Sequence, residues 1–185
     1  MMLIIGITGT LGAGKGTIVD YLVNSRGFLH FSVRAFISEE IVKRGMVVNR
    51  DSMVIVANDL RKNNSPSYIT DCLYEEAIAA GKNSIIESIR TPGEVYSLRE
   101  KGRFILMAID ADPEIRYQRI KQRQSETDQI DFQTFLDNEK REMNSTDPNA
   151  QNLKKCMELA DFRLWNNGTM EQLNRAVEGI LERIG

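Results

Sequence analysis

Residues that commonly hold metals or form disulfides are scarce in this chain. Its 185 residues include only two cysteines and one histidine. Cys72 and Cys156 fall in helix-like segments far apart in the sequence, so we expect two reduced core thiols rather than a disulfide or metal pair. His30 has no partner at a metal-ligand spacing, and we expect it to be structural. A disulfide scaffold and a Cys/His metal centre are therefore not indicated.

An excess of charge of either sign is also lacking. Lys and Arg total 24 against 26 Asp and Glu, a formal net charge of −2. No segment is basic enough to indicate general nucleic-acid binding. No apolar run approaches the roughly 20 residues that cross a bilayer, and the apolar residues 1–7 lack the length and basic start of a signal peptide. We expect a cytoplasmic protein without nucleic-acid or membrane partners.

Strand-like and helix-like segments alternate along the whole chain. Apolar runs that predict strands lie at residues 3–8, 28–31, 84–89, 104–109 and 162–165. Helical stripes separate them, which is typical of a parallel sheet covered on both faces. The length suits one domain with a full core. We predict a single domain over residues 1–185, with a three-layer α/β/α fold and a five-stranded parallel sheet.

Local signals mark several helix ends. The first helix is predicted over Lys15–Arg26, because a glycine follows it directly. Thr91 with Glu94, and Thr169 with Gln172, have the spacing of capping boxes. These pairs predict helices that begin just after residues 91 and 169.

The turn after the first predicted strand carries the most specific motif. Gly9 is followed, after four residues, by Gly14-Lys15 and then Gly16-Thr17, which fits the P-loop pattern. Glycines let backbone N–H groups turn inward around an anion, and the helix that begins there adds unpaired N–H groups. The predicted ATP-binding residues are Gly9, Thr10, Leu11, Gly12, Ala13, Gly14, Lys15, Gly16 and Thr17. Lys15 would contact the β- and γ-phosphates as a catalytic residue, and Thr17 would ligate Mg²⁺.

The motif at residues 14–17 resembles the Gly-Lys-Gly-Thr of adenylate kinase and related nucleoside monophosphate kinases. Those enzymes carry Asp-Gly-x-Pro-Arg after the third strand, with an acid near the Mg²⁺–phosphate region and an arginine that binds the acceptor's phosphate. Glu87 and Arg90 stand at these two positions, whereas the residues between them depart from the motif. The resemblance implies an ATP-dependent phosphotransferase for nucleoside or deoxynucleoside monophosphates, with Glu87 catalytic and Arg90 binding the acceptor.

The same resemblance implies an acceptor-binding arm after the second strand. Residues 33–64 hold two helical stripes and correspond to that arm. Arg34 is predicted as a second contact to the acceptor's phosphate, although it is displaced from the arginine usual in those families. Arg61 is the alternative for this role.

Three arginines mark a further helix near the ligand edge. Arg116, Arg119 and Arg123 are three and four residues apart, so they share one helical face. Arginines from a closing flap often balance the charge of a transferring phosphoryl group. We predict Arg119 and Arg123 as catalytic residues. The charged residues 124–152, with an amphipathic segment that includes Phe135, are expected to form a lid-like insertion rather than core.

The turn after the fifth predicted strand offers a second resemblance. Its sequence, residues 166–169, is similar to the Asn-Asn-Gly-Thr/Ser turn near the adenine pocket of dephospho-CoA kinase. This implies that Asn167 and Gly168 bind ATP. Dephospho-CoA kinase is therefore an alternative function, in which Glu87 would be the base for a ribose hydroxyl. The second-strand region lacks the Asp-Ala-Asp-like signature expected of that enzyme.

A function of another class stays open at this stage. The chain would be an ATP-binding regulatory switch if it bound nucleotide tightly but phosphorylated no small acceptor. As a kinase, it would use ATP, Mg²⁺ and a small-molecule phosphate acceptor, and we expect a monomer or homodimer.

Overall fold

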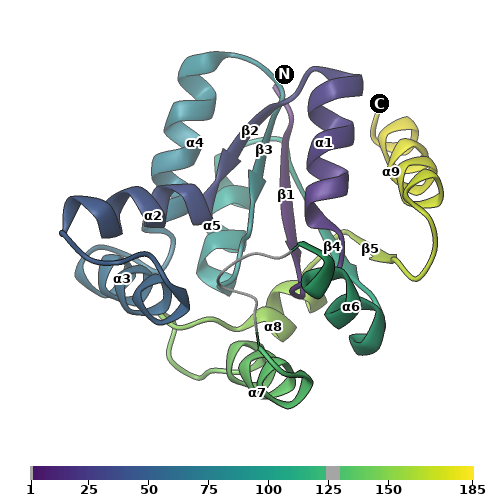
Figure 1. Ribbon diagram of the computed structural model, residues 1–185. Coiled ribbons are helices and arrows are strands. Elements are labelled where there is room, and N and C mark those ends of the chain that lie inside the picture. The colour runs from purple at the N-terminus through teal and green to yellow at the C-terminus, as the bar shows by residue number, and fades with distance from the viewer. Residues whose placement is uncertain (1, 124–129) are drawn as a thin grey trace.

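The chain folds around one parallel β-sheet. The structure, a computed structural model, describes residues 2–123 and 130–185 (Figure 1). The strands are β1 (Ile4–Gly9), β2 (Leu29–Ser32), β3 (Ser84–Glu87), β4 (Phe104–Asp110) and β5 (Phe162–Trp165). They lie in the order β2-β3-β1-β4-β5, and neighbouring strands are parallel. The predicted five-stranded parallel sheet is confirmed.

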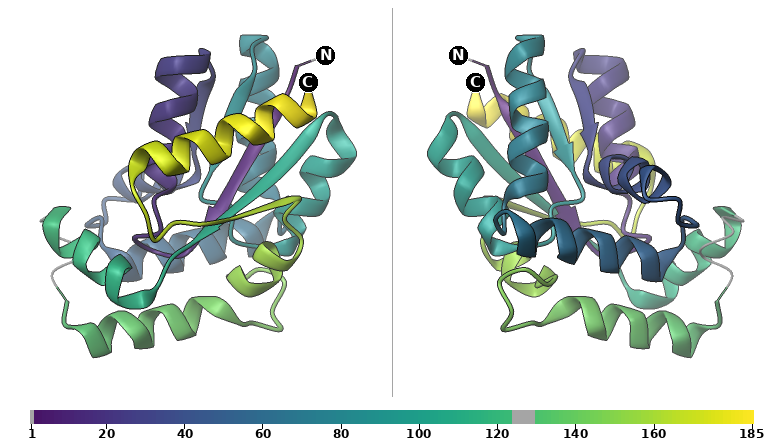
Figure 2. Two further views of the ribbon diagram at one scale, coloured as in Figure 1. Left: turned by 90° about the vertical axis from the view of Figure 1, so that its right-hand side faces the viewer. Right: turned by 90° about the vertical axis from the view of Figure 1, so that its left-hand side faces the viewer.

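Helices cover both faces of this sheet. They are α1 (Lys15–Arg26), α2 (Val33–Lys43), α3 (Arg50–Asn63), α4 (Tyr68–Ala80), α5 (Pro92–Lys101), α6 (Pro113–Arg123), α7 (Phe132–Met143), α8 (Leu153–Glu158) and α9 (Met170–Ile184). Figures 1 and 2 show α1 and α9 on one face and α4, α5 and α8 on the other. The three layers match the predicted fold class. Among the described residues, no helix is both long and apolar enough to cross a membrane.

Short-range sequence signals set the helix ends. α1 spans the predicted Lys15–Arg26. The Thr91 side chain accepts a hydrogen bond from the backbone N–H of Glu94, and that of Thr169 accepts one from Gln172. Both predicted capping boxes are therefore present, because each depends only on residues three positions apart.

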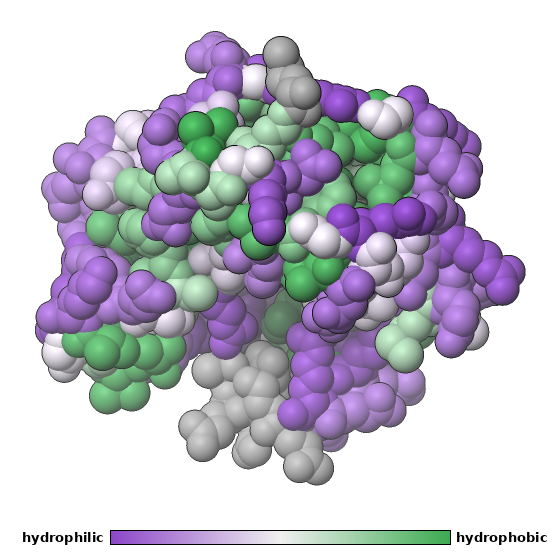
Figure 3. Space-filling view, turned by 90° about the horizontal axis from the view of Figure 1, so that it is seen from above, coloured by the Kyte–Doolittle hydropathy of each residue, from purple (hydrophilic) through white to green (hydrophobic). Residues whose placement is uncertain are grey.

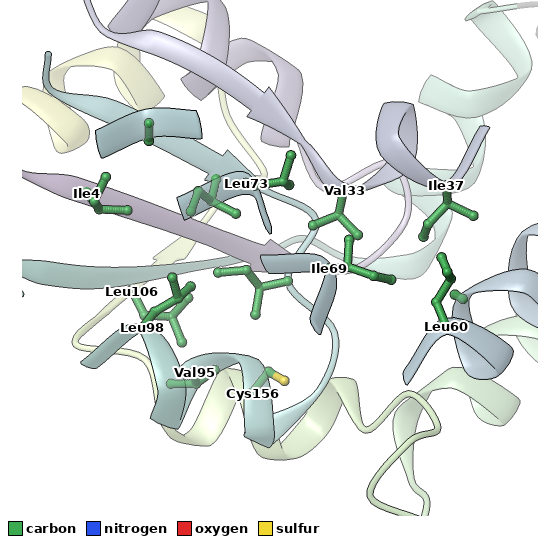
Figure 4. Close-up of a cluster of buried hydrophobic side chains, with 14 of the residues drawn as sticks. Ile4, Val33, Ile37, Leu60, Ile69, Leu73, Val95, Leu98, Leu106 and Cys156 are labelled. Carbon is green, nitrogen blue, oxygen red and sulfur yellow. The ribbon is translucent and has the colours of Figure 1, made fainter. Parts of the chain in front are cut away.

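β1 is buried on both faces, which explains its continuous apolar sequence. Ile5 and Ile7 belong to the core cluster that α1 and α9 cover, whereas Ile4 belongs to the cluster on the opposite face. Figure 4 shows the latter cluster, which includes Cys156 of α8. Cys156 is fully buried and Cys72 is half-buried, and both are free thiols. The expected reduced core thiol is confirmed at Cys156.

β3 ends two residues earlier than its apolar run predicted. Ser88 has a φ of 73°, in the left-handed region that non-glycine residues seldom adopt. The backbone N–H groups of Ser88 and Ile89 donate to the Ile7 carbonyl oxygen, at 3.0 and 3.1 Å. The predicted strand 84–89 is wrong at its last two residues because this turn interrupts the ladder. It places residues 87–90 at the carboxyl edge of the sheet.

α7 packs against the body of the protein. Phe135 is 1% exposed, and its ring lies 5.7 Å from that of Tyr117 on α6, measured between centroids. The expectation that residues 124–152 stand apart from the core is therefore wrong for α7, because its apolar side needs a partner surface. The first part of that segment, residues 124–129, lies outside the described residues.

The outer surface of α2, α3 and their connection is unusually apolar. Val42, Val47 and Ile55 are 64%, 77% and 59% exposed. Figure 3, a view from above, shows hydrophobic side chains gathered at its lower left. This is the end of the molecule where α2 and α3 lie. The segment predicted as an arm therefore presents apolar side chains to solvent as well as to the core.

Candidate active site

The P-loop turn depends on glycine at two close approaches. Gly9 has a φ of 144° and Gly12 a φ of 80°. A Cβ atom added to Gly9 would lie 2.0 Å from the Ile109 carbonyl oxygen, and one added to Gly12 would lie 2.5 Å from the Arg116 carbonyl oxygen. Side chains at these positions are excluded by the backbone of β4 and α6. The loop therefore curls tightly in front of the N-terminus of α1, where backbone N–H groups attract anions.

Lys15 is held against this loop. Its Nζ donates to the carbonyl oxygens of Gly9 at 2.9 Å and Thr10 at 2.8 Å. Burial, with a further contribution from the positive charge of Arg90, lowers the pKa of Lys15 from 10.5 to about 7, while nearby Glu87 acts in the opposite direction. A phosphate beside Nζ would favour the charged form. The side chain is thus placed for an anion that enters the loop.

Two residues whose supporting role the sequence analysis did not predict hold the loop from the neighbouring strands. Thr10 Oγ1 donates to Asp110 Oδ1 at 2.5 Å, at the end of β4. The Nδ2 of Asn166, just after β5, donates to the Ala13 carbonyl oxygen at 2.8 Å. Both are polar residues at the carboxyl end of an apolar strand, and that position was the available signal.

Arg116 joins the P-loop to α7. Its side chain is 2% exposed, and its Nη2 donates to Glu139 Oε1 at 3.0 Å. Its Nε donates to the Ala111 carbonyl oxygen at 2.8 Å, and its Nη1 donates to that of Leu11 at 3.3 Å. The ring of Phe135 lies under the guanidinium. Through these contacts Arg116 holds the P-loop and α7 together, which is a structural role.

A cavity of about 500 Å³ opens beside the P-loop. The P-loop residues that line it are Leu11, Gly12, Gly14, Lys15, Gly16 and Thr17. It brings together the following predicted site residues from other elements: Arg34, Glu87, Arg90 and Arg123. Arg119, Asn167 and Gly168 are not among the described residues that line it. Their predicted roles stay predictions.

Asn167 has a structural partner across the edge of the sheet. Its Nδ2 donates to Asp112 Oδ2 at 2.8 Å, and its Oδ1 accepts the Asp112 backbone N–H at 2.9 Å. The side chain thereby joins the turn after β5 to the turn after β4. Contact of Asn167 with ATP stays a prediction.

Glu87 is an ionised carboxylate at the cavity wall. Burial would raise its pKa, but the nearby His30 side chain, a hydrogen bond from Ser88 and the charge of Lys15 outweigh this and lower it to about 2. Ser88 Oγ donates to Glu87 Oε1 at 2.7 Å, and His30 Nε2 lies 3.8 Å from Oε2. The histidine expected to be structural therefore lies beside the candidate acid.

Glu142 of α7 bridges two arginines across the cavity. Its Oε2 accepts a hydrogen bond from Arg90 Nη1 at 2.5 Å, and its Oε1 accepts one from Arg50 Nη2. Arg90 Nη1 also donates to Gln151 Oε1 at 3.0 Å. Burial would raise the pKa of Glu142, but Arg90 and Arg50 hold it below its usual range. The sequence analysis missed Arg50 and Glu142, because only the fold brings them to Arg90.

The donor set fits magnesium bound chiefly through a nucleotide. Among residues 2–123 and 130–185, no group of three or more His, Cys, Asp or Glu side chains is placed to hold a metal. Thr17 lines the cavity at the start of α1. Mg²⁺ commonly takes only one or two protein ligands and receives the rest from phosphates and water. Thr17 is therefore the residue that would hold it.

Comparison with known proteins identifies the family. A family model described as an AAA domain matches residues 5–147, more than half of the chain. The chain belongs to the AAA domain family. Two relatives of this AAA-domain protein are UPF0200 proteins. PH1008 of Pyrococcus horikoshii is 27% identical over 98% of this chain and 97% of its own length. MJ1399 of Methanocaldococcus jannaschii is 28% identical over 99% of this chain and 91% of its own length.

Solved structures resemble this AAA-domain protein over nearly its whole length. A sugar kinase from Janibacter sp. has a TM-score of 0.60 at 18% identity, over 98% of this chain and 95% of its own. A shikimate kinase from Bacteroides thetaiotaomicron has a TM-score of 0.60 at 14% identity, over 98% of this chain and 99% of its own. At these identities the likeness shows the fold alone, which this chain shares with these two kinases.

Proposed function

We propose that this protein transfers the γ-phosphoryl group of ATP to a nucleoside or deoxynucleoside monophosphate. The observation that carries the proposal is a single cavity that joins a P-loop to a pair of arginines, Arg50 and Arg90. The P-loop would hold the donor's phosphates, and the arginines would hold the acceptor's phosphate. The fold shared with sugar and shikimate kinases supports phosphoryl transfer in general.

Each side chain has a distinct role in this proposal. Lys15 would bind the transferring phosphoryl group, and Arg123 would add positive charge at the cavity wall. Thr17 would ligate Mg²⁺, which supplies charge neutralisation between the phosphates. Glu87 would orient water bound to that ion, because its low pKa keeps it ionised. Phosphoryl transfer depends mainly on positioning and electrostatics, so no covalent nucleophile is required.

The low pKa of Glu87 weighs against dephospho-CoA kinase. In that alternative Glu87 would take a proton from a ribose hydroxyl, but a carboxylate with a pKa of about 2 is a weak base. ADP release should be assayed with a panel of monophosphates and with dephospho-CoA. The proposal expects turnover of a monophosphate. Turnover of dephospho-CoA alone, or tight ATP binding without turnover of any acceptor, would contradict it.

Replacing Arg90 with lysine tests the acceptor site. A guanidinium can hold a phosphate through two parallel hydrogen bonds, which lysine cannot reproduce. Arg90→Lys should raise the KM for the monophosphate about 10-fold to 100-fold, the effect of losing a charged hydrogen bond. The KM for ATP should change little. The matched control is Arg99→Lys on α5, whose guanidinium donates to Asp161 and to the Leu159 carbonyl oxygen and does not line the cavity. An unchanged acceptor KM in Arg90→Lys would refute the assignment.

Glu142 is expected to compete with the acceptor's phosphate. Its two carboxylate oxygens already engage Arg50 and Arg90, as two phosphate oxygens would. Glu142→Gln should therefore lower the acceptor KM about threefold to tenfold, because the arginines lose a neutralising charge. Glu182→Gln on the exposed side of α9 is the control. A higher acceptor KM in Glu142→Gln would mean instead that the carboxylate holds the arginines in place for the acceptor.

A further inference from the structure

The end of the cavity between α2 and α3 holds most of its apolar side chains. They are Val33, Ile37, Val48, Met53, Val54 and Ala57. The three most buried of them, Val33, Ile37 and Ala57, are 2%, 5% and 3% exposed. The P-loop end presents backbone amides and Lys15 instead. A ligand that spans the cavity therefore needs one anionic end and one apolar end.

Among the polar residues that line the cavity from α2 and α3, Arg61 is the most deeply buried. Arg61 is 2% exposed and lines the cavity. Its Nε and Nη2 donate to Glu94 Oε1, at 3.2 and 2.8 Å. Its Nη1 is buried and has no hydrogen-bond partner among the residues that the structure describes. Proteins rarely leave a buried charged N–H without an acceptor. We therefore expect a ligand to supply the acceptor for this nitrogen.

The charge around Arg61 limits what that atom is. The Glu94 side chain is 0% exposed and neutralises the guanidinium at 2.8 Å. Its Oε2 also accepts the backbone N–H groups of Arg90 and Thr91, at 2.8 and 3.0 Å, so it is fixed in place. A phosphate on Nη1 would leave a net negative charge in a buried apolar site, which is costly. An uncharged oxygen or nitrogen would satisfy the N–H without that cost.

We propose that the α2–α3 end of the cavity is a ring-binding subsite. In it, Arg61 Nη1 donates to a carbonyl oxygen or ring nitrogen of a planar base while the apolar side chains contact the faces of the ring. This inference rests on the proposed function, since it assigns the base-bearing end of the acceptor. It gives Arg61 a role different from the phosphate contact considered from the sequence.

Binding experiments without ATP test the subsite separately from phosphoryl transfer. A panel of nucleoside monophosphates and ribose 5-phosphate, which has the phosphate and sugar but no base, is titrated calorimetrically into the protein. At least one monophosphate should bind tenfold or more tightly than ribose 5-phosphate. Equal affinities throughout would overturn the inference.

Arg61→Lys then tests the donor itself. Lysine keeps a positive charge for Glu94 but lacks Nη1. The variant should bind the preferred monophosphate about threefold to tenfold more weakly, the usual effect of one hydrogen bond, and ribose 5-phosphate unchanged. Equal weakening of both ligands, or no weakening of either, would overturn the inference.

A second variant avoids the buried ion pair. Val54→Ala removes apolar contact from the subsite at a residue that is only half-buried, so the fold should survive. It should weaken the preferred monophosphate severalfold and leave ribose 5-phosphate unchanged. Base-dependent binding without any kinase activity would contradict the proposed function but support the subsite. Kinase activity on monophosphates with base-independent binding would do the reverse.

Discussion

Lys15→Ala is expected to reduce turnover about 10²-fold to 10³-fold, the usual effect of removing one preorganised donor to developing charge. Lys15 is half-buried against the loop carbonyl oxygens, and desolvation lowers its pKa to about 7. Phosphate in the loop would accept its hydrogen bonds in place of those carbonyls. Desolvation disfavours the charged form of Lys15. The variant should therefore unfold at the same temperature as the parent protein or at a higher one.

The measurement is steady-state release of ADP, with thermal unfolding of each protein recorded in parallel. Lys82→Ala is the control, because this lysine is exposed in the turn after α4. It should retain full turnover. A Lys15→Ala variant that is folded and nearly fully active would show that the P-loop is not the reaction site.

Arg116→Met is expected to lower the free energy of unfolding by about 3 kcal/mol, near the lower end for breaking a buried ion pair. The variant leaves Glu139 without its guanidinium partner and removes donors from the carbonyl oxygens of Ala111 and Leu11. Methionine preserves much of the apolar stem, so the loss reports the polar contacts. Since Leu11 lies in the P-loop, affinity for ATP should fall as well.

Urea denaturation measures this loss as a lower midpoint at an unchanged m-value. Arg175→Met on α9 is the control, because this arginine is exposed and surface substitutions usually change stability by less than about 0.5 kcal/mol. A shift in Arg116→Met no larger than in the control would mean that the contacts of Arg116 contribute nothing to the fold.

Much of the fold could be predicted because its determinants are local. The extent of α1 and the two capping boxes depend on residues within a few positions of one another. The continuous apolar sequence of β1 predicts a strand covered on both faces. The end of β3 could not be predicted, because it depends on a contact between distant parts of the chain. Ser88 adopts its left-handed conformation where its backbone N–H donates to the carbonyl oxygen of Ile7, which lies 81 residues earlier in the sequence.

The candidate site was predictable only where a motif carries it. The P-loop was recognisable because glycines and Lys15 must stand in a fixed order. Glu142 carries no such signal, since it is one acid among many on a charged segment. Its position between Arg50 and Arg90 follows from the packing of α7, which joins residues 52 and 92 positions apart in sequence. The spacing of Arg116, Arg119 and Arg123 could not show that Arg116 is buried behind the P-loop, because a shared helical face does not tell solvent from core.

The Glu94 carboxylate links two walls of the cavity, α3 and the loop after β3. It accepts hydrogen bonds from the Arg61 side chain of α3 and from the backbone N–H of Arg90. Sliding α3 past the loop after β3 would break charge-assisted bonds where water does not reach. These two walls therefore keep their spacing as ligands enter and leave.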